Sequence, residues 1–93
     1  MNLRERHFIR LDKISKPYIN ACDEWRKDCH QKRRQWIIDN PDARSVPGFY
    51  TTESMVQWFL EKHNIVVSHN LSGITKLGFA SKADVTLFTL KNS

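Results

Sequence analysis

The feature that most constrains this fold is one long helical pattern, bounded by prolines at Pro17 and Pro41. Pro17 suits the first turn of a helix, where its missing N–H costs little, and Ser15 offers an N-cap hydroxyl. Asn40 precedes a proline, and that position disfavours helical backbone. The pattern therefore predicts a helix that begins near Ser15 and ends at about Asp39.

The apolar face of this helix follows from its spacing. At about 100° per residue, five apolar side chains fall within about 40° of one line. They are Tyr18, Cys22, Trp25, Cys29 and Trp36. We expect this apolar stripe to point into the core, because thiols and large aromatic rings on one helical face are typical of buried residues.

Cationic side chains lie beside the apolar stripe, over about the next 120° of the helix. These residues, here called the basic strip, are Arg26, Lys27, His30, Arg33 and Arg34. Glu24 and Asp28 fall on the opposite flank, so the charges are predicted to be segregated. Such a strip is typical of a solvated helix face, and it also suits an anionic partner.

Capping signals predict two further helices. The first begins where Thr51 or Thr52 can cap it, and it ends where Asn64 can adopt a left-handed conformation. The last segment, 81–92, alternates like a strand, but the sequence "SKAD" has the S-x-x-D form of a capping signal that begins at Ser81. We therefore favour a helix there.

Three shorter segments predict a small antiparallel sheet. Residues 65–69 and 74–80 are expected to form a hairpin with its turn at 70–73, and His7 to Leu11 are expected to form an edge strand. The resulting order, β-α-α-β-β-α, predicts one α+β domain over residues 1–93. The long N-terminal helix and the second helix are expected to pack on the sheet.

Helical spacing also predicts which side chains of the later helices are buried. The core face of the second helix is expected to hold Met55, Val56, Phe59 and Leu60. Leu87 and Leu90 are expected to face the sheet, with Phe79 packed beneath them. Trp58 falls off the core face, so it is either exposed, and then a candidate partner contact, or packed under the loop 41–50.

The cysteines and histidines do not form a recognisable metal or catalytic pattern. Cys22 and Cys29 are separated by about 10 Å along the predicted helix, whereas two ligands of one zinc ion lie within about 4 Å of each other. The same separation disfavours a disulfide. Cys29 beside His30 could make a reactive thiol, but its place on the apolar stripe predicts burial. We therefore predict no catalytic residue, metal or cofactor, and a non-enzymatic protein.

The composition is that of a globular chain with a net charge of +5, which permits nucleic acid, a phosphate-rich surface or an acidic protein as partner. The first residues, "MNLRERHFIRL", carry charges where a signal peptide would be apolar. No apolar run is long enough to predict a membrane span. A cytoplasmic location without membrane contact is expected, with free thiols.

The end of the chain resembles the ends of small uncharacterised bacteriophage proteins, in which a strand precedes a phrase of the form F-x-[DS]-x-x-D-A-x-x-F-x-L-[RK]. The matching residues are Phe79, Ser81, Asp84, Phe88, Leu90 and Lys91. Val85 replaces the usual alanine, and the "CDEW" sequence at 22–25 is similar to an upstream helix of such proteins. The resemblance implies a strand–helix C-terminus and a viral origin, which would place the protein in a bacterial cytoplasm. It implies no activity.

The leading functional hypothesis is a phage-type accessory protein that binds a host or viral protein through the basic strip, with Trp58 as a further candidate contact. Nucleic acid on the same strip is the first alternative, and a structural virion component is the second. A second copy of the chain is a further candidate partner, because a small domain can cover apolar surface by association.

Overall fold

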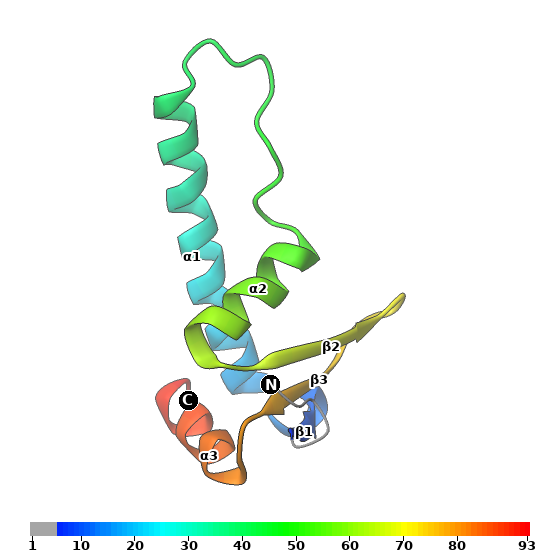
Figure 1. Ribbon diagram of the computed structural model, residues 1–93. Helices are drawn as coiled ribbons and strands as arrows, with labels where there is room; N and C mark the ends of the chain where they lie inside the picture. The colour runs from blue at the N-terminus through cyan, green and yellow to red at the C-terminus, as the bar shows by residue number, and fades with distance from the viewer. Residues whose placement is uncertain (1–5) are drawn as a thin grey trace.

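The computed structural model describes residues 6–93 and shows the predicted order of elements (Figure 1). The elements are β1 (His7–Arg10), a short 3-10 helix η2 (Leu11–Lys13), α1 (Ser15–Asp39), α2 (Thr52–His63), β2 (Val66–Asn70), β3 (Gly73–Phe79) and α3 (Lys82–Lys91). The α+β class and the order β-α-α-β-β-α are thus confirmed.

The sheet has the strand order β1-β3-β2, and both pairings are antiparallel. The hairpin and the edge position of β1 are therefore confirmed. Leu77 of the central strand pairs with Ile9 on one side and Val67 on the other, and it is fully buried. An irregularity between Ser68 and His69 shifts the register near the hairpin turn.

The start of α1 differs from the prediction. Ile14 is the N-cap residue and Ser15 is already helical, with no side-chain cap. The reason is the 3-10 turn that runs directly into α1. Its last bond joins the Ile14 N–H to the Leu11 carbonyl at 3.1 Å, and the Ile14 carbonyl then accepts from the Tyr18 N–H at 3.0 Å. The end at Asp39 agrees with the prediction.

The predicted caps of the later helices are confirmed. The Thr51 hydroxyl accepts from the Ser54 N–H at 3.1 Å, and Ser81 caps α3 by accepting from the Asp84 N–H at 3.3 Å. Asn64 ends α2 in the left-handed region with φ 54°. The N–H of Ile65 then donates to the Phe59 carbonyl at 3.2 Å, so this carbonyl near the helix end has a hydrogen-bond partner.

The core lies between the sheet and the three helices. Its largest fully buried side chains are Phe59, Phe79, Ile65, Leu77 and Cys29. Cys22 and Trp25 of the apolar stripe are buried as predicted. Phe79 also packs as expected beneath α3, with its ring centroid 5.5 Å from that of Phe88.

Two leucines of α3 do not face the sheet, contrary to the prediction. Leu87 is 63% exposed and Leu90 is 69% exposed, whereas Phe88 is buried. The inner face of α3 instead follows Val85, Phe88 and Asn92, at spacings of three and four residues. The Asn92 carbonyl accepts from the Asn20 side chain at 2.6 Å, and this bond ties the end of α3 to α1.

The inner face of α2 is also rotated from the predicted one. Met55, Trp58 and Phe59 are buried, while Leu60 is 38% exposed. Trp58 is therefore buried, so the alternative in which its side chain is exposed is wrong. Its ring centroid lies 5.1 Å from that of Phe59 on the same helix. Residues of α1, which crosses α2 at this place, lie beside the Trp58 ring.

The last part of α1 and the loop after it extend away from the sheet as an arm (residues 30–50), visible at the top of Figure 1. None of the residues in the arm is buried. Trp36 is only half-buried, so its predicted place in the core is wrong. The physical reason is length: the sheet, α2 and α3 cover only the first half of a 25-residue helix. The arm gives the molecule extents of 48 × 26 × 25 Å.

Within residues 6–93, no helix combines the length and the apolar character that crossing a membrane requires.

Candidate binding surfaces

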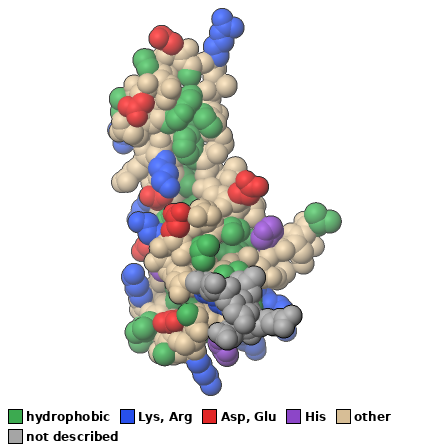
Figure 2. Space-filling view, viewed as in Figure 1, with side chains coloured by type: hydrophobic (Ala, Val, Ile, Leu, Met, Phe, Trp, Pro, Cys, Tyr) green, Lys and Arg blue, Asp and Glu red, His purple; other side chains and the backbone are tan. Residues whose placement is uncertain are grey.

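The basic strip lies on the exposed side of α1, as the sequence predicts. Arg26 and Lys27 lie on the half of α1 that packs against the other elements, and His30, Arg33 and Arg34 lie on the arm. All five side chains are exposed. Figure 2 shows Lys and Arg side chains spread along the long axis with acidic ones between them on the face in view, so the charge does not form one block there.

The charges of α1 are less segregated than predicted. Asp23 falls inside the basic strip and accepts from the Arg26 guanidinium at 2.9 Å. Both side chains are more than half exposed, so this pair contributes little to stability. Asp28 pairs with Lys32 at 3.0 Å. In the part of the chain that the structure describes, no ion pair involves the other four members of the basic strip.

Exposed isoleucines lie in line with the basic strip. The α1 row, as we call this line, contains Ile19, Asp23, Arg26, His30, Arg33 and Ile37. Its members follow one another at spacings of four, three, four, three and four, so they share one face of the helix over about 27 Å. Ile19 is 54% exposed and Ile37 is 39% exposed. The row is therefore apolar at both ends and charged in the middle.

Sequence reasoning missed the two isoleucines of the α1 row. Their spacing from Arg26 and Arg33 is readable in the sequence, but an isoleucine on a helix is ordinarily assigned to a core. Their exposure follows from the tertiary structure, because α2, α3 and the sheet all lie on the other side of α1.

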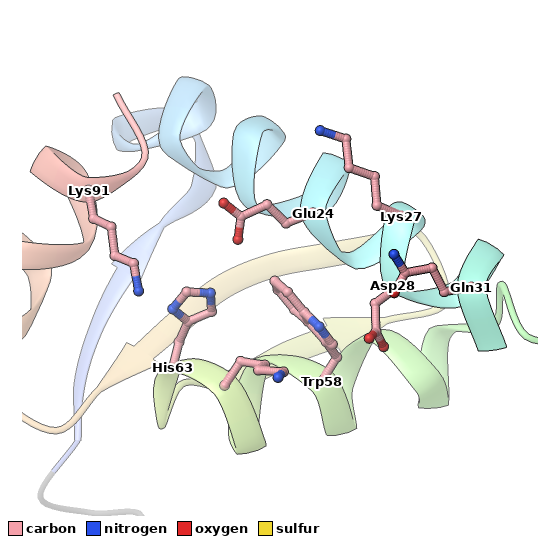
Figure 3. A pocket seen from close by; sticks show the side chains of 8 residues that line it. Glu24, Lys27, Asp28, Gln31, Trp58, His63 and Lys91 are labelled. Carbon is pink, nitrogen blue, oxygen red and sulfur yellow. The ribbon is translucent and has the colours of Figure 1, made fainter.

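On another side of α1, a hollow of about 360 Å³ opens between the three helices (Figure 3). Its lining residues are Glu24, Lys27, Asp28, Gln31, Trp58, Lys62, His63 and Lys91. A second hollow of about 370 Å³ adjoins the first, and the two share Lys62, His63 and Lys91. This site could not be predicted from the sequence, because its residues come from three separate helices and fit no short motif.

Two residues that line the first hollow each have a ring nitrogen without a hydrogen-bond partner among the described residues. Trp58 Nε1 and His63 Nε2 are buried, and neither has a partner among residues 6–93. The contrast with Trp25 is clear, because its Nε1 donates to the Ser54 hydroxyl at 3.3 Å. A buried polar atom without a partner costs free energy, so these two atoms call for an explanation.

Burial lowers the pKa of His63, and the nearby Lys91 and Lys62 ammonium groups lower it further, while Glu24 acts in the opposite direction. The imidazole is therefore neutral at neutral pH, because its ordinary pKa is already about 6.5. The positive charges at this place are those of the two lysines.

The two cysteines are buried and free. Burial raises the pKa of Cys22, which keeps its thiol protonated. Cys29 donates to the Phe49 carbonyl at 3.1 Å, which ties the base of the arm to α1. His30 is exposed on another face, so the structure does not bring it to the Cys29 thiol. Among the described residues, no three His, Cys, Asp or Glu side chains gather as metal ligands.

No protein-family model matches the chain, and no curated protein or solved structure matches it. The exposed side of α1 and the hollow between the helices are therefore the features of the molecule that bear on function.

Proposed function

We propose that this chain is a non-enzymatic accessory protein of phage type that binds an acidic protein of the host or the virus. The binding surface is the α1 row together with the basic strip. The viral origin is part of the proposal and is supported by the resemblance of the C-terminal segment, from Phe79 to Lys91, to small phage proteins.

The single observation that carries this proposal is the composition of the α1 row. Arginine and exposed aliphatic side chains on one helix face suit a protein partner, whose apolar side chains can cover the two isoleucines while its carboxylates pair with the cations. The spacing of the row, alternately three and four residues, matches the face that a second helix would contact. An extended or helical acidic segment with apolar residues at both ends is the complementary partner.

A protein partner fits this surface better than nucleic acid. Asp23 lies inside the row and would repel phosphates, and it already forms an ion pair with Arg26. Ile19 and Ile37 would gain nothing from a phosphate backbone, because backbone recognition depends on cations and hydrogen-bond donors. The net charge of +5 contributes to the rate of encounter with an acidic protein.

Two variants of equal charge test the proposal by affinity capture from bacterial extract. The first carries Arg26→Glu, Arg33→Glu and Arg34→Glu on α1. The second, a matched control, carries Lys13→Glu, Lys76→Glu and Lys82→Glu at exposed sites outside α1. We expect an acidic protein to be retained by the wild type and the control but lost by the α1 variant. A photo-cross-linking residue at His30 should then link to that protein, whereas one at Thr86 should not.

Three outcomes would contradict the proposal. Equal recovery of every partner by both variants would remove the role of α1. A mobility shift of DNA or RNA at low salt, abolished only in the α1 variant, would assign the surface to nucleic acid. Self-association of the purified chain, abolished only in the α1 variant, would make a second copy the partner.

A further inference from the structure

Opposite charges line the first hollow without pairing with each other. Glu24 enters from α1, Lys62 from α2 and Lys91 from α3, and none of the three takes part in an ion pair within residues 6–93. In Figure 3 the Glu24 carboxylate points from α1 toward the space above His63, and the Lys91 ammonium group points toward the same imidazole from the other side. Charges that share a small hollow and remain separated leave room for a molecule between them.

The walls of the hollow differ in charge. The α1 wall carries Glu24, which has no ion pair among the described residues, and Asp28, which pairs with Lys32. The Lys27 tail on the same helix turns away from the space (Figure 3). The opposite wall carries Lys62 and Lys91 beside the neutral His63. A ligand with one positive and one negative end would complement both walls, whereas a simple anion or cation would face repulsion from one of them.

The buried nitrogens point to the same conclusion independently. Trp58 is 6% exposed, and its indole N–H lacks an acceptor among the described residues. Indole N–H groups donate only, so the missing partner is an acceptor such as a carboxylate or phosphate oxygen. Both nitrogens belong to residues that line the hollow, and the long lysine side chains beside them change rotamer rapidly. A ligand can therefore reach the indole without a change of the fold.

We propose that the hollow between α1, α2 and α3 is a binding site for a small zwitterion, a molecule with a primary ammonium group and an oxyanion a few bonds apart. The ammonium group binds the Glu24 carboxylate, and the oxyanion binds Lys62 and Lys91 and accepts from the Trp58 indole. The volume of about 360 Å³ lies at the lower end of the range of small-molecule sites. No residue of the α1 row lines this site, and only Lys27 is shared with the basic strip. The ligand is therefore tested independently of the protein partner.

The Trp58 indole N–H gives a direct reporter in a ¹H–¹⁵N NMR titration of the full chain. The probes are O-phosphoethanolamine and γ-aminobutyrate, which carry the same ammonium group with a phosphate or a carboxylate as the oxyanion. Inorganic phosphate, butyrate and ethanolamine serve as half-ligands. We expect a saturable shift of the Trp58 indole signal with at least one zwitterion, weaker binding of each half-ligand, and no comparable shift of the Trp25 indole, which is already bonded to Ser54. The tighter of the two zwitterions identifies the oxyanion.

Single substitutions separate the site from general effects of charge. Lys91→Gln and Glu24→Gln should each weaken the zwitterion about tenfold, the typical effect of losing one hydrogen bond to a charged group. Lys82→Gln, on an exposed part of α3 outside both hollows, should leave the affinity unchanged. An unchanged Trp25 indole signal without ligand shows that each variant is folded.

The absence of a saturable shift with both zwitterions would overturn the proposal. Equal affinity for the half-ligands, or equal weakening by Lys82→Gln and Lys91→Gln, would overturn it as well.

Discussion

The rings of Trp58 and His63 pack edge to face on α2, with their centroids 5.1 Å apart and their planes at 68°. The same imidazole lies 5.4 Å from the ring of Phe88 on α3. His63 therefore connects the end of α2 to the inner face of α3, while one of its nitrogens remains without a partner among the described residues. The His63 side chain thus packs between two helices and also carries a buried nitrogen, Nε2, without a partner among the described residues.

His63 should make the stability of the protein depend on pH. Its pKa is lower in the folded protein than in the unfolded chain, mainly because of burial and then because of Lys91. The unfolded chain therefore takes up the proton first as the pH falls. We expect full stability from this group above about pH 6.5, and a loss as the pH falls from there through the lower pKa of the folded protein.

Urea unfolding as a function of pH measures this loss. His63→Gln should reduce the loss of stability below neutral pH, whereas His30→Gln, at an exposed position on the arm, should leave it in place. The titration of the His63 ring by NMR gives the pKa itself. A folded-state value above the ordinary one would contradict the prediction.

Phe88 should carry most of the packing of α3. Phe88→Ala removes a buried ring that contacts Phe79 and His63, so the free energy of unfolding should fall by about 3–5 kcal/mol. Leu87→Ala, at the adjacent exposed position, should change it by less than about 0.5 kcal/mol. Chemical denaturation compares the two, and similar losses would mean that α3 does not have the observed orientation. If Phe88→Ala is too unstable to measure, Phe88→Leu gives the smaller change.

Thr51 should stabilise α2 through its cap. Thr51→Ala removes the acceptor of the Ser54 N–H, which is bonded at 3.1 Å, and should cost about 1 kcal/mol of unfolding free energy. Thr52→Ala is the matched control, because Thr52 is exposed, lies inside the helix and provides no cap. Equal effects of the two substitutions in thermal or urea unfolding would show that the cap does not stabilise the helix.

The arm should open more readily than the rest of α1. Residues 31–39 contain no buried side chain, whereas the first half of the helix packs through Ala21, Cys22, Trp25 and Cys29. Amide hydrogen exchange should therefore be faster over 31–39 than over 18–29, because local opening there exposes little apolar surface. Uniform protection along α1 would contradict this expectation. Binding of a protein partner to the α1 row should raise the protection of the arm.

The sequence by itself determined the features that depend on near neighbours. Thr51, Ser81 and Asn64 set helix ends through bonds to backbone only a few residues away, so their roles were readable from local chemistry. The long helix and the hairpin followed from periodicity and from turn residues in the same way. Ser15 was the exception, because a 3-10 turn continued into α1 and left Ile14 in the cap position.

Only the tertiary structure decided which face of each helix is buried. In α3, Phe88 is buried while Leu87 and Leu90 are exposed, and Trp36 lies outside the core because the sheet, α2 and α3 cover only the first half of α1. The tertiary structure also placed Glu24, His63 and Lys91 around one hollow, although they are far apart in the sequence. Periodicity defines a face but not its neighbour, because burial depends on which elements pack against that face, and those contacts join distant parts of the chain.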